Sequence, residues 1–142
     1  MQNRDTPPSR VVAVFNGTPD ALLMLRVALE HAGFTVVPVL MRDIQDDVPG
    51  LEAILRGRSP DVVVYDIAPP YEAQWHALQL LKTTPPLSRC YFILTSTNRP
   101  QVDRLAGLDP QVFAIIGTPY DLKDVIQAVH GALEAGLPPS ST

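Results

Sequence analysis

Short runs of apolar residues recur five times along the chain, and the stretches between them show apolar residues at helical spacing. The runs are rich in Val and Ile and do not alternate with polar residues, a pattern typical of strands buried on both faces of a parallel sheet. They predict strands at residues 11–15, 35–40, 61–65, 91–94 and 112–116.

The stretches between the runs predict helices. The first helix is expected to begin near Pro19, with Thr18 or Asp20 as its N-cap, and to end at Gly33. Its predicted apolar side consists of Leu22, Leu25, Val27, Leu29 and Ala32.

The remaining helices differ in length. A short second helix is carried by Leu51, Ile54 and Leu55 and ends at Gly57. A third is carried by Trp75, Leu78, Leu80 and Leu81, and a weaker fourth lies between Pro100 and Gly107. The fifth is capped by Asp121 and closed by Gly136.

Strand and helix alternate five times, which predicts an α/β domain with a doubly wound parallel sheet and helices on both faces. We expect this domain to span residues 10–136. The polar, proline-containing residues 1–9 predict a disordered tail, and residues 137–142 predict a second tail or the start of a linker. In such sheets binding takes place beyond the carboxyl ends of the strands.

Composition narrows the class of protein. With 142 residues, 46% of them hydrophobic, the chain is long enough for one domain with its own core. The single Cys90 fits a reducing cytoplasm and is expected to be an inert, small apolar residue. A net charge of -4 without a basic stripe argues against direct nucleic-acid binding, and no apolar run approaches the ~20 residues that span a membrane.

Polar residues follow four of the predicted strands. Asn16 and Gly17 follow the first, Asp66 the third, Thr95 the fourth and Thr118 the fifth. We expect Asn16, Thr95 and Thr118 to donate hydrogen bonds to the Asp66 carboxylate and form a static polar cluster. The three histidines stand apart from other metal-ligating residues, so no metal site is predicted.

The order and spacing of these residues resemble the receiver domain of bacterial two-component response regulators over residues 10–136. Residues 16–34 resemble that family's first loop and helix, and residues 60–66 resemble its third strand. The resemblance implies a flavodoxin-like (βα)5 fold with strand order 2-1-3-4-5. It also implies that Asp66 occupies the phosphoacceptor position and Thr95 the position of the strand-four Thr or Ser.

The sequence departs from that family at the other site positions. Asn16 and Gly17 stand where the family has an acidic pair that holds Mg²⁺, and Thr118 stands where it has a lysine. Ile115 stands where the family has a switch aromatic. The resemblance therefore implies a degenerate site without a metal or other cofactor, in which Asp66 is inactive or weakly active.

These observations favour an atypical receiver domain that is not an enzyme and acts as a phosphorylation-independent protein-interaction module in signalling. The resemblance implies a protein partner or a homodimer through the face of helix four, strand five and helix five, within residues 100–133, and contact with a sensor histidine kinase through residues 21–30. One alternative is a conventional receiver phosphorylated on Asp66 with Mg²⁺.

The third candidate function, after these two, is that of a flavodoxin-like ligand-binding or enzymatic domain. Against it, no G-x-G-x-x-G sequence follows the first strand. Ala68 also stands where phosphatases with an aspartyl nucleophile need a second Asp.

Overall fold

A computed structural model describes residues 10–43, 48–55 and 58–136. The two predicted tails, 1–9 and 137–142, and the predicted end of the second helix at Gly57 lie outside the described residues. No helix among the described residues is long and apolar enough to cross a bilayer.

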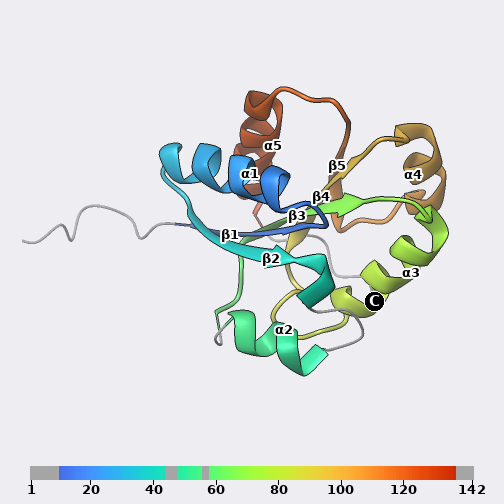
Figure 1. Cartoon of the computed structure of the whole chain (residues 1–142), viewed down its shortest axis with the longest axis horizontal. Helices are drawn as coiled ribbons and strands as arrows, with labels where there is room; N and C mark the ends of the chain where they lie inside the picture. Colours follow the sequence, from blue (N-terminus) through green and yellow to red (C-terminus); the bar gives the residue numbers. More distant parts are fainter. Residues whose placement is uncertain (1–9, 44–47, 56–57, 137–142) are drawn as a thin grey trace, which may run out of the picture.

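The described residues form a five-stranded parallel sheet in the order β2-β1-β3-β4-β5, which confirms the predicted fold class and strand order (Figure 1). The strands are β1 (Val11–Asn16), β2 (Thr35–Leu40), β3 (Val62–Ile67), β4 (Tyr91–Ser96) and β5 (Val112–Gly117). β3 and β4 run two residues further than predicted because their parallel pairing continues through Asp66 opposite Thr95 and Ile67 opposite Ser96.

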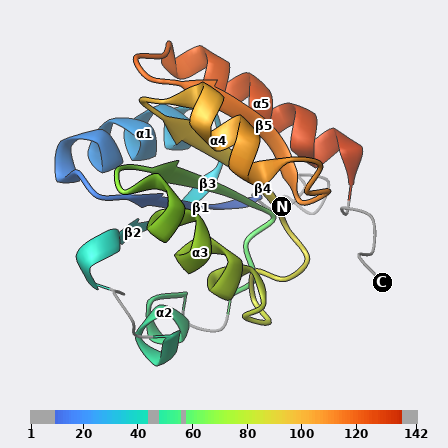
Figure 2. The same cartoon turned by 90° about the vertical axis from the view of Figure 1, so that its right-hand side faces the viewer.

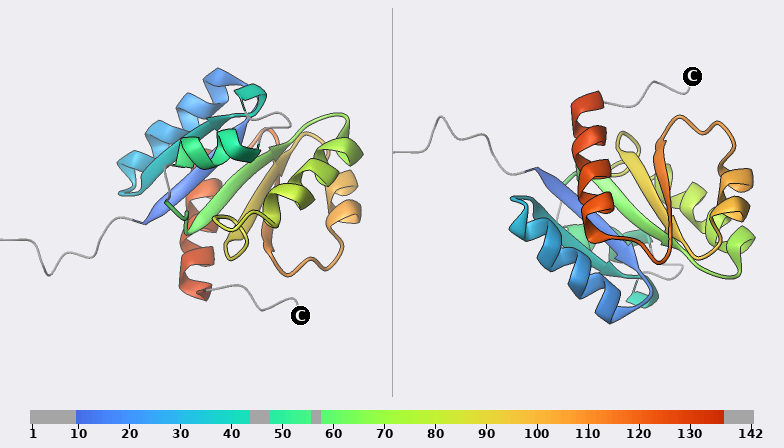
Figure 3. Two further views of the ribbon diagram at one scale, coloured as in Figure 1. Left: turned by 90° about the horizontal axis from the view of Figure 1, so that it is seen from below. Right: turned by 90° about the horizontal axis from the view of Figure 1, so that it is seen from above.

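Helices cover both faces of the sheet (Figures 1 and 2). They are α1 (Pro19–His31), α2 (Val48–Leu55), α3 (Tyr71–Lys82), α4 (Arg99–Ala106) and α5 (Leu122–Ala135), with a 3₁₀ turn at Met41–Asp43. Figure 3 shows α1 and α5 in front of the sheet from above and α2 and α3 in front of it from below.

The strands divide their side chains between these two layers. Val12 and Val14 of β1 belong to the core under α1 and α5, whereas Ala13 and Phe15 belong to the core under α2, α3 and α4. Because neighbouring residues of a strand point to opposite faces, a strand buried on both sides must be apolar throughout. The two cores therefore explain the unbroken apolar runs in the sequence.

Two of the predicted helix faces are partly wrong. On α1 the buried residues are Leu25 and Leu29, whereas Val27 is 57% exposed and Ala32 is also exposed. On α3, Leu80 is 70% exposed. Val27 and Leu80 each lie two residues from a buried leucine, which is about 200° around a helix of 3.6 residues per turn and places them toward solvent.

The predicted helix ends are correct at α5 but not fully at α1. Asp121 accepts a hydrogen bond from the backbone N–H of Lys123 at 3.3 Å, and Gly136 closes the helix with a φ of 83°. Thr18 occupies the N-cap position of α1, but its side chain makes no capping hydrogen bond.

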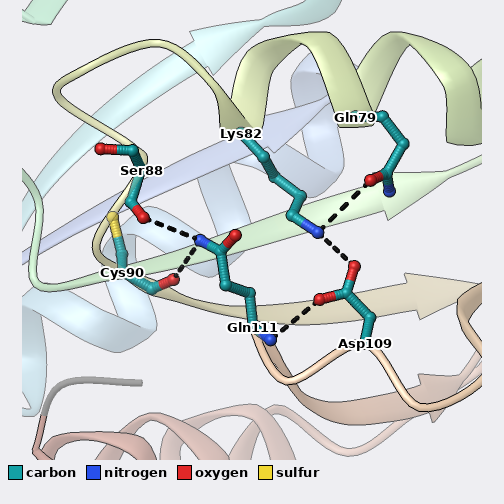
Figure 4. A network of polar contacts seen from close by, with 6 residues as sticks. All are labelled: Gln79, Lys82, Ser88, Cys90, Asp109 and Gln111. Atoms are coloured by element: carbon teal, nitrogen blue, oxygen red, sulfur yellow. Dashed lines mark hydrogen bonds and ion pairs between the residues drawn. The ribbon is translucent and has the colours of Figure 1, made fainter. Parts of the chain in front are cut away.

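A polar network joins α3 to the amino ends of β4 and β5 (Figure 4). Lys82, at the end of α3, forms a buried ion pair with Asp109, and its ammonium lies 5.9 Å from the centre of the Trp75 ring. Asp109 also accepts the backbone N–H of Gln111 at 2.9 Å.

Gln111 extends this network by donating its side-chain amide to the carbonyl oxygens of Ser88 and Cys90 (Figure 4). Cys90 is buried, and burial raises the pKa of its thiol to about 12. The buried, protonated thiol agrees with the expectation of an inert residue. The network lies at the amino ends of β4 and β5, opposite the carboxyl ends of the strands, where Asp66 lies.

Candidate functional site

Asp66 and Thr95 meet at the carboxyl edge of the sheet as predicted. They are register partners on β3 and β4, and the Thr95 hydroxyl Oγ1 donates a hydrogen bond of 2.7 Å to Oδ1 of Asp66. Thr95 is fully buried and Asp66 is half-buried. Parallel pairing of two strands thus brings together side chains that are 29 residues apart in sequence.

Asn16 and Thr118 lie at the same edge but do not hydrogen-bond to Asp66, so this part of the predicted cluster is wrong. Oδ1 of Asn16 accepts the backbone N–H of Thr18 at 3.0 Å, which is the local turn that asparagine commonly makes. The Thr118 side chain is exposed, and its backbone N–H donates to the carbonyl of Ser96 at 2.7 Å.

The other two degenerate positions contribute no polar group. Gly17 is exposed, and a Cβ placed on it would meet nothing within 4 Å. Ile115 is partly buried and packs against the core under α3 and α4.

Beside Asp66 lies an open depression of about 340 Å³ between α1 and the start of α5. Of the residues that the structure describes, it is lined by Asn16, Thr18, Ala21, Met24, Leu25, Asp66, Thr97, Thr118, Pro119, Tyr120 and Leu122. Asp66 is the single ionisable carboxylate in this lining, which contains no Lys, Arg or His.

Eight of the eleven lining residues were not among the predicted site positions, among them Met24, Thr97 and Tyr120. Met24 lies on α1, Thr97 follows β4 and hydrogen-bonds through its hydroxyl to that of Tyr71 at 2.8 Å, and Tyr120 lies in the loop before α5. Thr97 and Tyr120 each stand two residues after a predicted site residue, Thr95 and Thr118, and this proximity could have indicated them. Nothing in the sequence distinguishes Met24 from the exposed apolar residues around it.

The carboxylate of Asp66 carries an uncompensated charge. Burial raises its pKa above the ordinary value of 3.8, and the hydrogen bond from Thr95 partly opposes this shift. Burial and the negative charge of Asp66 also raise the pKa of Tyr120. None of the ion pairs among the described residues involves Asp66, and its side-chain hydrogen-bond partner is the neutral hydroxyl of Thr95.

The residues at this edge do not fit a bound Mg²⁺ ion. Within the described part of the chain, no group of three or more His, Cys, Asp or Glu side chains could hold a metal ion. Mg²⁺ is bound by carboxylates, waters and substrate phosphates in octahedral geometry. Here Asp66 is one carboxylate, the Asn16 oxygen is taken by Thr18, and Gly17 has no side chain.

A shallow groove of about 610 Å³ runs along the outer face of α4, β5 and α5. β5 is an edge strand of the sheet, and its Phe113 is 38% exposed while packing edge-on against Tyr91 with ring centres 5.3 Å apart. Arg99, Asp121 and Asp124 are the charged residues among those that line the groove. This face is the one at which the resemblance to receiver domains implies a partner.

Comparison with known proteins identifies the fold. Neither a protein-family model nor a curated protein matches the sequence. Solved structures do match: a response regulator from Thermotoga maritima is 16% identical with a TM-score of 0.68, over 89% of this chain and 99% of that one. The chemotaxis protein CheY4 of Vibrio cholerae is 12% identical with a TM-score of 0.69, over 88% and 99%.

A response regulator receiver domain from Methylobacillus flagellatus is 15% identical with a TM-score of 0.68, over 88% of this chain and 99% of that one. The chain therefore has the CheY-like receiver fold.

Proposed function

We propose that the chain is a receiver-like module of bacterial two-component signalling that works through protein contact, without phosphorylation of Asp66 and without enzymatic activity. The observation that carries this proposal is the isolation of Asp66, which has one neutral hydrogen-bond donor and no cation among the described residues. Phosphoryl transfer depends on positioning and on neutralising the phosphoryl oxygens with metal and cation. Loss of one such contributor costs ~10²–10³ in rate, and two are missing here.

The proposed contact surface is the α4–β5–α5 face, and the proposed occupant is a second copy of the chain. A two-fold interface places the same patch on both subunits, so the patch must be complementary to itself. The groove meets this requirement because it carries Arg99 together with Asp121 and Asp124, and it has the partly exposed Phe113 ring as an apolar anchor. Aromatic side chains and arginines contribute much of the binding energy of interfaces.

Sedimentation at increasing concentrations of the full chain tests this proposal. We expect a monomer–dimer equilibrium that Phe113→Ser weakens by about ten-fold or more. Leu108→Ser is the matched control, because Leu108 is a more exposed apolar residue outside the groove. The charge reversal Arg99→Glu also weakens the dimer and tests the face without altering the packing of Phe113.

The same measurement with acetyl phosphate and Mg²⁺ tests independence from phosphorylation. We expect the same dissociation constant with and without the phosphoryl donor, and the same constant in Asp66→Asn. A dimer that tightens with acetyl phosphate in the wild type but not in Asp66→Asn would instead support the conventional switch. A chain that stays monomeric at every concentration would overturn the proposed interface.

A further inference from the structure

The depression beside Asp66 combines one charged group with apolar walls. Met24 and Leu25 of α1 form one wall, and Pro119, Tyr120 and Leu122 form the other. Pockets that bind small molecules have this composition, with mostly apolar lining and a few polar groups that fix orientation. The volume of about 340 Å³ lies near the lower end of the range for such pockets, so the fitting ligand is small.

The charge of the lining selects the class of ligand. An anion is disfavoured because Asp66 is negative and no Lys, Arg or His lines the depression in the described part of the chain. A neutral apolar ligand would cover the carboxylate without pairing it, and a buried unpaired charge is costly. A divalent metal ion lacks the further oxygen ligands it requires.

An organic cation matches both the carboxylate of Asp66 and the apolar walls of the depression. Its charged nitrogen donates charge-assisted hydrogen bonds to the carboxylate, and its carbon atoms contact the apolar walls. The aromatic ring of Tyr120 adds a surface that attracts cations. We propose that the depression between α1 and the start of α5 binds a small primary ammonium ion with an apolar group, held by the carboxylate of Asp66. Pro119 and Tyr120 also line the groove on the α4–β5–α5 face, whereas Asp66, Met24 and Leu25 line the depression alone, so variants of Asp66 and Met24 test this site apart from the proposed dimer.

Titration of the full chain with benzylammonium at pH 7, followed by backbone amide shifts in ¹H–¹⁵N NMR spectra, tests the proposal. We expect saturable shifts centred on residues of the lining, with a dissociation constant on the order of 1 mM for a ligand of this size. Benzyl alcohol has nearly the same shape without the charge, and we expect it to bind about ten-fold more weakly or worse. Benzoate should not bind at this site.

Two pairs of variants locate the binding. Asp66→Asn should weaken benzylammonium binding about ten-fold and bring it close to that of benzyl alcohol. Asp103→Asn removes an exposed carboxylate outside the depression and should change nothing. Met24→Gln should weaken binding, whereas Leu23→Gln should not, because the two residues are 56% and 59% exposed on the same helix but only Met24 lines the depression.

Equal affinity for benzylammonium and benzyl alcohol would overturn the proposal, and so would shifts that do not saturate or that Asp103→Asn reduces as much as Asp66→Asn. If Asp66→Asn failed to fold, the two ligands and the pair of α1 variants would still decide the question. Equal responses of Met24→Gln and Leu23→Gln would then contradict the proposed site.

Discussion

Asp66 at the carboxyl edge of the sheet and Asp109 at the amino edge are both partly shielded from water, yet their surroundings differ. Asp109 pairs with Lys82 and accepts a backbone N–H, and the network extends through Gln111 to two carbonyl oxygens. Asp66 has the hydroxyl of Thr95 and faces an open depression. A buried carboxylate with its cation is a fixed part of the fold, whereas one without a cation remains available to a ligand.

Removal of the Lys82 ammonium, which pairs with Asp109 at the amino edge of the sheet, should have the largest effect on stability. We expect Lys82→Met to lower the free energy of unfolding by about 3–5 kcal/mol, because it leaves Asp109 buried without its partner. Urea unfolding measures the loss. Lys123→Met is the control, since Lys123 and Asp121 form an exposed pair 3.9 Å apart that should contribute less than about 1 kcal/mol. Similar losses for both variants would show that the network does not stabilise the edge.

Removal of the one donor at the carboxyl edge should have a smaller effect. Thr95→Val keeps the shape of the side chain but leaves the Asp66 carboxylate without its hydrogen bond, which should cost about 2 kcal/mol at pH 7. Thr97→Val is the control and should change the free energy of unfolding by less than about 0.5 kcal/mol, because its bond to Tyr71 is exposed. Equally small changes in the free energy of unfolding for Thr95→Val and Thr97→Val would contradict this prediction.

The charge of Asp66 should reduce stability, unlike that of Asp109. We expect Asp66→Asn to raise the free energy of unfolding at pH 7 by up to about 1 kcal/mol, because Asn can still accept the hydrogen bond from Thr95 without burying a charge.

The pH dependence of this gain has a definite sign. Since the pKa of Asp66 is raised in the folded state, that state binds the proton more tightly than the unfolded state does. The stabilising contribution of protonation is complete below the ordinary pKa of 3.8, which applies to the unfolded state, and is lost as pH rises through the higher folded pKa. The advantage of Asp66→Asn over the wild type should therefore shrink on acidification through this range. An advantage independent of pH would contradict the assigned shift.

Added Mg²⁺ should leave the thermal stability of the chain unchanged. A ligand stabilises the folded state only to the extent that its concentration exceeds its dissociation constant, and one carboxylate binds Mg²⁺ weakly. Thermal melts in millimolar Mg²⁺ and in EDTA should coincide. A midpoint several degrees higher in Mg²⁺ would reveal a metal site at the carboxyl edge.

The fold and the pairing of Asp66 with Thr95 could be predicted from the sequence because they follow from the apolar runs and from the common direction of parallel strands. The hydrogen bond of Asn16 could not be predicted, since an asparagine at a strand end can bond either a neighbouring side chain or the backbone of its own turn, and here it accepts the backbone N–H of Thr18. The ion pair between Lys82 and Asp109 could not be predicted from the sequence either. A lysine in the last turn of an amphipathic helix is usually solvated, and its partner Asp109 is 27 residues away.

We infer that the carboxyl edge of the sheet lacks the groups for phosphoryl chemistry although it keeps Asp66. Three positions account for this lack: Asn16 at the end of β1, Gly17 after it, and Thr118, which lines the depression with Asp66. A side chain fits at Gly17, because a Cβ there meets nothing within 4 Å.

The most direct measurement is the intact mass of the chain after incubation with acetyl phosphate and Mg²⁺. We predict no phosphoryl adduct on the wild type or on the single variants Asn16→Asp, Gly17→Asp and Thr118→Lys. The triple variant should take up a phosphoryl group, because its metal ligands and its cation act together. Stoichiometric, Mg²⁺-dependent modification of the wild type that disappears in Asp66→Asn would contradict the account.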